Sequence, residues 1–259
     1  MSMKKKRNVY IVGNWKMNPV TPEEAKTLYT KINKASQGAK KVHTIVCPPS
    51  IHIPLFAKVT KKYARLGSQD AFFEQEGSFT GNVSPLMFKN AGVEYVIVGH
   101  SERRALGETD EIVSKKVRAV LASGLRPIVC VGERERDSAG AYLTFIHNQV
   151  LKSVEGVDAL SLSKIIFAYE PVWAIGKKYT DVMKPSDVHE MSLYIKKTLS
   201  RLYPKDEALA VPVLYGGSVN FENAQPILLD GEVAGLLIGR QSLDAVEFSK
   251  IVAYANQLD

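Results

Sequence analysis

The stretch Val9-Tyr10-Ile11-Val12-Gly13-Asn14-Trp15-Lys16-Met17-Asn18 decides between the two α/β architectures open to this chain. Its first four residues form a continuous apolar run, which is typical of a strand buried on both faces. An open, doubly wound sheet that binds a dinucleotide would place a glycine-rich turn directly after such a strand. The residues that follow form no such turn. We therefore favour a closed parallel barrel over the open sheet.

Short apolar runs rich in Val and Ile recur along the chain and predict further buried strands. With the first, there are eight: Val9–Val12, Thr44–Cys47, Arg65–Ser68, Tyr95–Val98, Pro127–Val131, Lys164–Ala168, Pro212–Leu214 and Val233–Ile238. Segments with helical spacing lie between them. They are Pro22–Ala35, Asp110–Leu121, Ala141–Val154, Ser186–Tyr203, Asn220–Leu229 and Ala245–Gln257, with weaker signals at Ile51–Tyr63 and Ser84–Ala91.

Strands that alternate with helices pair in parallel through right-handed crossovers. Eight such units in a chain of 259 residues have the size of a (β/α)8 barrel. We predict a single α/β domain of this kind over residues 1–259, with residues 1–7 as a basic N-terminal tail. Asp110, Ser186 and Asn220 are the expected helix N-caps.

Composition excludes several classes of protein. Hydrophobic residues make up 45% of the chain, enough to offset the ordering entropy that keeps low-hydropathy chains disordered. No apolar run is long enough to span a membrane. The formal net charge is +7, and the only dense cluster of basic residues is the tail Lys4–Arg7, which no nucleic-acid-binding motif accompanies. Cys47 and Cys130 lie in apolar runs as expected for reduced core thiols, and no spacing suggests a metal site. We expect a cytoplasmic protein without a metal or cofactor.

Polar residues follow five of the predicted strands at their carboxyl ends. A barrel brings these ends together on one face, where active sites of this architecture lie. The residues concerned are Asn14 and Lys16, Gly99-His100-Ser101-Glu102, Glu170, Gly216-Gly217-Ser218, and Gly239-Arg240. Each alone has a commonplace structural explanation. Together they place a lysine, an imidazole, a carboxylate and two glycine turns around one opening.

The glycine turns after the last two strands occupy the usual phosphate position of such barrels, where backbone N–H groups meet an anion. An acid–base set beside a phosphate site indicates proton-transfer chemistry on a phosphorylated substrate.

Four motifs closely resemble the signatures of the triosephosphate isomerase family, in matching order from Val9 to about Tyr254. They are Asn14-Trp15-Lys16-Met17-Asn18, Gly99-His100-Ser101-Glu102-Arg103-Arg104, Ala168-Tyr169-Glu170-Pro171-Val172-Trp173-Ala174-Ile175-Gly176 and Tyr215-Gly216-Gly217-Ser218-Val219. The resemblance implies a TIM barrel that interconverts dihydroxyacetone phosphate and D-glyceraldehyde 3-phosphate through an enediol(ate), in glycolysis and gluconeogenesis.

The resemblance also implies residue roles. Glu170 matches the base and His100 the neutral electrophile, which a short helix over Ser101–Leu106 would disfavour as imidazolium. Lys16 and Asn14 match the cation and the amide that stabilise charge on the substrate oxygen. Glu102 matches the carboxylate that pairs with the lysine.

Further expectations concern the phosphate, the lid and the partner subunit. Backbone N–H groups of Gly176, Ser218, Gly239 and Arg240 match those that bind the phosphate. Segment Pro171–Asp181 matches a lid that excludes water, and Ile175 and Leu237 match the apolar residues that clamp the base. The loop Gly77–Gly81, with Thr80, matches an arm that inserts into a second subunit, so we expect a homodimer.

This chain departs from the family pattern at three places. Arg240 stands where many members have a second glycine. The lid usually continues with Thr, Gly and Lys, and here it reads Lys177-Lys178-Tyr179-Thr180-Asp181. Asn82 replaces a glutamate that often pairs with the arginine matched by Arg103. Three alternatives to the isomerase remain: a phosphate-binding barrel without turnover, a barrel enzyme for a larger sugar or indole phosphate, and a basic RNA-binding protein.

Overall fold

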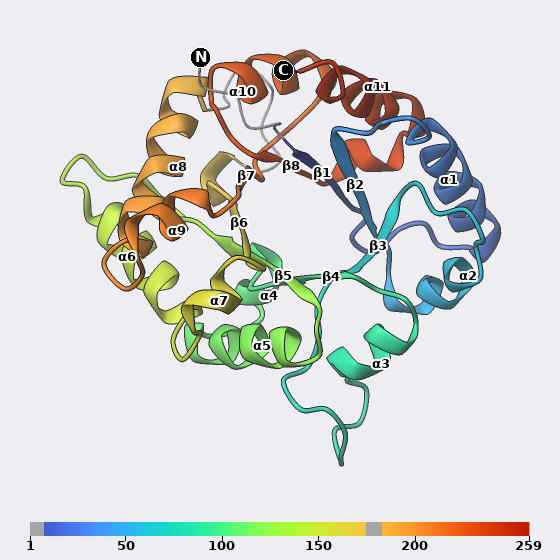
Figure 1. Cartoon of the computed structure of the whole chain (residues 1–259), viewed down its shortest axis with the longest axis horizontal. Helices are drawn as coiled ribbons and strands as arrows, with labels where there is room; N and C mark the ends of the chain where they lie inside the picture. Colours follow the sequence, from blue (N-terminus) through green and yellow to red (C-terminus); the bar gives the residue numbers. More distant parts are fainter. Residues whose placement is uncertain (1–7, 175–182, 259) are drawn as a thin grey trace.

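The structure is a computed structural model that describes residues 8–174 and 183–258. Within them, strands β1 to β8 pair in parallel and in chain order, and β8 closes the ring against β1 (Figure 1). The strands are β1 (Val9–Asn14), β2 (Val42–Cys47), β3 (Arg65–Ser68), β4 (Tyr95–Val98), β5 (Arg126–Val131), β6 (Ile166–Tyr169), β7 (Val213–Tyr215) and β8 (Gly235–Ile238). The predicted closed barrel is confirmed.

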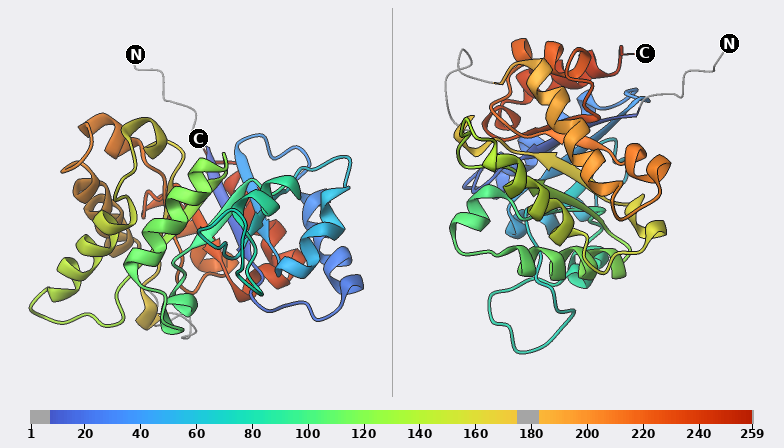
Figure 2. Two further views of the ribbon diagram at one scale, coloured as in Figure 1. Left: turned by 90° about the horizontal axis from the view of Figure 1, so that it is seen from below. Right: turned by 90° about the vertical axis from the view of Figure 1, so that its left-hand side faces the viewer.

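The helices surround the barrel on its outside (Figures 1 and 2). They are α1 (Pro22–Ala35), α2 (Ile53–Ala57), α3 (Pro85–Asn90), α4 (Ser101–Ala105), α5 (Asp110–Ala122), α6 (Ala141–Ser153), α7 (Ala159–Leu162), α8 (Pro185–Leu199), α9 (Lys205–Ala210), α10 (Phe221–Leu229) and α11 (Ala245–Ala255). Short 3-10 turns are η1 (Ser50–His52), η2 (Val172–Ala174) and η4 (Arg240–Leu243).

The core has two layers because each strand is buried on both faces. Along β1, Val9 and Ile11 pack outward against the helices, whereas Tyr10 and Val12 point into the barrel. Successive strand residues alternate between faces, so a strand covered on both sides needs apolar residues at every position. The continuous apolar run Val9–Val12 is therefore explained by burial of β1 on both faces of the barrel wall.

Helix N-termini explain where several helices begin. Asn220 caps α10 as predicted, since its side chain accepts the Asn223 N–H at 2.9 Å. The predicted caps Asp110 and Ser186 are wrong. Thr109 caps α5 and leaves Asp110 in the first turn, where a carboxylate still favours the helix dipole. Lys184 precedes α8, and Pro185 begins it with a φ preset for a helix.

Two predicted helices are clearly shorter in the structure, and two short helices were not predicted. The segment predicted from Ser186 to Tyr203 ends at Leu199, and α7 and α9 were not predicted. Both have six residues or fewer, too short to show a helical period. The weak signal Ile51–Tyr63 is a 3-10 turn followed by α2, which ends at Ala57.

The segment between β3 and α3 extends away from the barrel wall beyond α3 (Figures 1 and 2). It carries Phe79 and Thr80, both exposed. Phe79 packs against Phe72 with ring centroids 4.7 Å apart. Among the helices of the described residues, none is long and apolar enough to cross a membrane.

Candidate functional site

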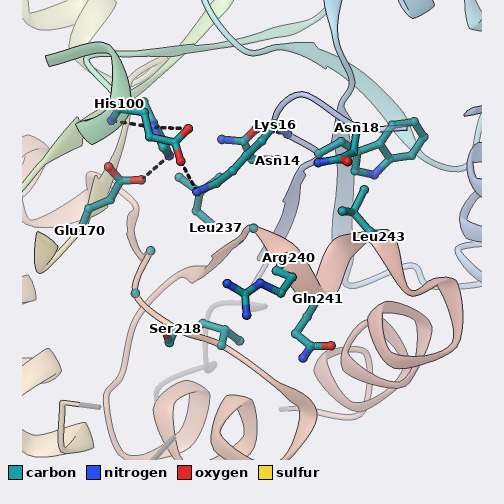
Figure 3. A pocket seen from close by; sticks show the side chains of 16 residues that line it. Asn14, Lys16, Asn18, His100, Glu170, Ser218, Leu237, Arg240, Gln241 and Leu243 are labelled. Carbon is teal, nitrogen blue, oxygen red and sulfur yellow. Dashed lines mark hydrogen bonds and ion pairs between the residues drawn. The ribbon is translucent and has the colours of Figure 1, made fainter. Parts of the chain in front are cut away.

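The carboxyl ends of β1, β4, β6, β7 and β8 surround one pocket of about 360 Å³ (Figure 3). Each of the five predicted strand ends contributes residues to its wall, although Gly99 and Ser101 do not line it. The lining includes Asn14, Lys16, His100, Glu102, Glu170, Gly216, Gly217, Ser218, Leu237, Gly239 and Arg240.

Lys16 enters the pocket from a strained backbone position. Its φ of 53° lies in the left-handed region, which few non-glycine residues adopt. Its N–H donates to the Asn14 side-chain oxygen at 3.0 Å, and its carbonyl accepts from the Gln69 amide at 2.7 Å. These two amides fix the loop after β1. Asn14 itself is only 4% exposed, so its polar side chain is built into the floor of the pocket.

The Lys16 ammonium is paired across the pocket mouth. Its Nζ lies 2.5 Å from a carboxylate oxygen of Glu102, which belongs to the first turn of α4. Both side chains retain contact with solvent, at 31% and 59% exposure. The pair holds a positive charge between the ends of β1 and β4, where an oxygen of a bound molecule can meet it.

His100 is the N-cap of α4, and this position fixes its tautomer. Its Nδ1 accepts the backbone N–H of Glu102 at 3.2 Å. A ring nitrogen that accepts carries no proton, so the neutral imidazole holds its proton on Nε2. Nε2 lies 3.2 Å from an oxygen of Glu170, on the pocket side.

Glu170 directly follows β6 and is 2% exposed. One oxygen accepts the Ser101 N–H at 3.1 Å, and the other faces His100 Nε2. These two donors hold the buried Glu170 carboxylate in place on the pocket wall. Figure 3 shows the carboxylate and the imidazole on the same side of the pocket.

Two glycines on the neighbouring strands pack against Glu170. A Cβ built on Gly132, after β5, would overlap the Glu170 carbonyl. A Cβ built on Gly216, after β7, would come within 2.9 Å of Glu170 Cγ. The absence of side chains at both positions therefore lets the strand end that carries Glu170 lie close to its neighbours.

Arginines fix the loop that carries His100. Arg104 donates to the Gly99 carbonyl at 2.7 Å and pairs with Asp110 at 2.5 Å, which ties the loop to the start of α5. Arg103 lies 3.1 Å from Asp70 of its own chain. Although Asn82 stands where many family members have a glutamate, Arg103 therefore has a carboxylate partner from the segment after β3.

A buried cluster supports this loop from below. Lys116 of α5 lies 2.6 Å from both Asp70 and Glu108, and its side chain is 4% exposed. Glu108 also accepts the Gly99 N–H at 3.1 Å. Burial raises the pKa of Asp70, and the neighbouring Lys116 opposes that effect.

The far side of the pocket consists of glycine turns. Ser218 donates to the Ala174 carbonyl at 3.1 Å, and the Asn223 amide donates to the Ser218 carbonyl at 2.9 Å. Gly239 lies beside Lys16, since a Cβ there would be 3.3 Å from Lys16 Cε. The turn after β8 therefore meets the lysine from β1, as closure of the ring requires.

The predicted site residues fall into three groups. Asn14, Lys16, His100, Glu102, Glu170, Ser218, Leu237, Gly239 and Arg240 share the pocket. Thr80 does not line it. Ile175 and Gly176 lie outside the described residues.

Sequence reasoning missed Gln69 and Gln241, and it did not foresee the backbone contact between Ser101 and Glu170. Gln69 directly follows β3, so the rule applied to the other strand ends would have found it. The Ser101 contribution is a backbone N–H, which no side-chain pattern reports.

The two cysteines are buried thiols, as predicted. Burial, followed by the charge of nearby Glu170, raises the pKa of the Cys130 thiol. Burial alone raises the pKa of Cys47. Within the described residues, no group of three His, Cys, Asp or Glu side chains could hold a metal ion.

Comparisons with known proteins agree with this geometry. The family model described as "Triosephosphate isomerase" matches residues 9–255. Curated proteins named triosephosphate isomerase are similar over 96% of this chain: that of Thermoanaerobacter pseudethanolicus is 41% identical and covered completely. That of Caldanaerobacter subterraneus is 40% identical and also covered completely, and that of Dehalococcoides mccartyi is 39% identical and covered to 97%. The chain belongs to the triosephosphate isomerase family.

Proposed function

We propose that this pocket interconverts dihydroxyacetone phosphate and D-glyceraldehyde 3-phosphate, an isomerisation of glycolysis and gluconeogenesis. The observation that carries the proposal is the meeting of Glu170, His100 and Lys16 on one pocket, with glycine turns opposite them. A three-carbon phosphate has one reacting end and one anionic end, and the two sides of the pocket suit these ends.

Glu170 acts as the base. A carboxylate with two oxygens can take a proton from the carbon next to a carbonyl and return it to the neighbouring carbon. In this structure both oxygens face protein donors, at 3.1 Å and 3.2 Å. Substrate binding must therefore exchange one of these contacts for the substrate carbon. Closure of a lid over residues 171–181 would remove water and strengthen the base.

His100 acts as the electrophile. The proton on Nε2 points into the pocket and can be donated to the substrate carbonyl oxygen, since Nδ1 is already occupied by the Glu102 N–H. Lys16 and Asn14 stabilise the charge that develops on that oxygen. Donors already held in place act without reorganisation, which is why one of them typically contributes about 3–4 kcal/mol to the transition state. Glu102 positions the Lys16 ammonium.

Backbone N–H groups of Gly176, Ser218, Gly239 and Arg240 bind the phosphate in this proposal. Leu237 and Ile175 form the apolar clamp on Glu170. Leu237 supports this role by its place on the pocket wall, where it is 3% exposed. Residues 1–259 act as one domain that needs no metal or cofactor.

We infer a homodimer in the cytoplasm. The arm containing Phe79 and Thr80 stands away from the barrel, and large apolar side chains are exposed on Met17 (90%), Phe79 (41%) and Met87 (56%). Phe79 lies on the arm, whereas Met17 follows β1 and Met87 belongs to α3, and large exposed apolar side chains of this kind favour a partner surface. Sedimentation equilibrium should give a dimer for the wild type and a monomer for Phe79→Asp, and a monomeric wild type would refute the inference.

The reaction is tested by the rate at which purified protein converts glyceraldehyde 3-phosphate, with Glu170→Gln as the control. The variant keeps the size of the side chain and loses the base, so turnover should fall to the background. Wild-type protein that binds inorganic phosphate without isomerising the triose would contradict the proposal and favour the barrel without turnover.

A further inference from the structure

The Arg240 guanidinium distinguishes this pocket from the glycine turn that many family members have after the eighth strand. Arg240 opens η4 directly after β8 and lines the same pocket as His100 and Glu170. Figure 3 shows its side chain reaching over the pocket on the side of Ser218, away from the imidazole and the base. The guanidinium is therefore next to the end of the pocket assigned to the phosphate.

The neighbouring carboxylates leave Arg240 available for an external anion. Of the acidic residues on the pocket wall, Glu102 pairs with Lys16 and Glu170 faces His100. Asp244, at the end of η4, accepts two backbone N–H groups at the start of α11, at 2.8 Å and 3.1 Å. Within residues 8–174 and 183–258, no ion pair or hydrogen bond involves the Arg240 side chain.

Among the described residues, the pocket thus has two side-chain cations, of which one is paired with a carboxylate and the other is not. Lys16 is committed to a carboxylate at the reacting end, whereas Arg240 has no counter-charge at the other end. A guanidinium offers a planar fork of N–H groups that matches two oxygens of a phosphate, and such charge-assisted pairs are stronger than neutral ones. A free guanidinium beside a glycine turn has the chemistry of a phosphate ligand.

We propose that the Arg240 side chain is a specificity-determining residue that binds the dianionic group of the substrate, in addition to the backbone N–H groups of the glycine turns. The proposal rests on the proposed function, because it places the phosphate at this end of the pocket. Its consequence is an affinity for phosphate dianions that depends on salt more steeply than that of a pocket with glycine at this position. The effect falls on binding and leaves the proton-transfer step to Glu170 and His100.

Three substitutions of Arg240 separate the contributions of its charge, its side-chain length and its backbone to phosphate binding. Arg240→Gln keeps much of the length and removes the charge, Arg240→Gly introduces the residue common in the family, and Arg240→Lys keeps the charge without the fork. Arg201→Gln is the matched control, since Arg201 is an exposed arginine after α8, outside the pocket. Thermal unfolding of each variant verifies that it is folded.

The first measurement is calorimetric binding of inorganic phosphate at pH 7.5, in low salt and at 0.2 M salt. In low salt the Gln and Gly variants should bind about threefold to tenfold more weakly than wild type, with Lys between them, because a partly exposed charge-assisted contact is lost. The difference should shrink at 0.2 M salt. Equal dissociation constants for Arg240→Gln and Arg201→Gln, or wild-type protein that binds no phosphate, would overturn the proposal.

The second measurement compares the effects of Arg240→Gln on KM and on kcat. The KM of Arg240→Gln should rise by the same factor as the phosphate dissociation constant, while kcat stays within about twofold. A fall in kcat without a change in KM would contradict a binding role. Phosphate binding is measured without turnover, so an inactive wild type whose phosphate affinity still depends on Arg240 would refute the isomerase proposal alone.

Discussion

Shortening Glu170 by one methylene tests the geometry of the base. Glu170→Asp keeps the charge and withdraws the carboxylate by about 1.5 Å, the length of one carbon–carbon bond. The present contacts of 3.1 Å to Ser101 and 3.2 Å to His100 would lengthen beyond hydrogen-bonding distance. A displacement of this size at a reacting group costs on the order of 100-fold or more in rate, which is about 3 kcal/mol in the barrier.

The assay is steady-state conversion of glyceraldehyde 3-phosphate, coupled to oxidation of NADH. We expect kcat to fall by about 100-fold to 1,000-fold with KM within about threefold, since the phosphate contacts are intact. Glu94→Asp is a matched control, because Glu94 is exposed, pairs with Arg65 and does not line the pocket. Unchanged turnover in Glu170→Asp would refute the assignment of the base.

Three further outcomes are expected. Lys16→Ala should lower kcat/KM by 100-fold or more and weaken phosphate binding, and full activity would remove Lys16 from the mechanism. Burial and nearby arginines lower the pKa of His43 from 6.5 to about 4, so the unfolded chain binds this proton first as pH falls and stability is lost between pH 6.5 and 4. The loss should be roughly 1–2 kcal/mol after allowance for partial solvent exposure, and urea unfolding of His43→Phe should lack it. Lys116→Met should cost roughly 2–4 kcal/mol in urea unfolding, because the buried Glu108 loses the ammonium at 2.6 Å and keeps only the Arg103 guanidinium at 3.6 Å as a charged partner. Lys152→Met, at an exposed ion pair, should cost less than about 1 kcal/mol. Equal losses would contradict the argument from the buried pair.

The barrel was predictable because a strand that is buried on both faces needs an apolar residue at every position. The run from Val9 to Val12 and its counterparts required no knowledge of tertiary structure. Most of the site could be predicted from one rule, namely that residues after the carboxyl ends of barrel strands meet on one face. Closure of the ring therefore brings Lys16, Glu170 and Arg240 together although they are far apart in the chain.

The remaining features depend on contacts that sequence spacing does not encode. Thr109 and Asp110 are adjacent and both can cap a helix, and only the backbone path decides that the threonine does so. The pairing of Arg103 with Asp70 joins the segments after two different strands. The direction of the Arg240 side chain likewise depends on the turn after β8 and was open at the level of sequence.

The glycines that flank Glu170 limit how this scaffold can be re-engineered. Substitution at Gly132 or Gly216 requires the backbone or the Glu170 side chain to move, because a single added carbon meets Glu170. Gly132 is the less tolerant of the two positions, since the added carbon would meet the Glu170 backbone. Arg240, whose side chain is exposed, can be exchanged without displacing the strand end that holds Glu170.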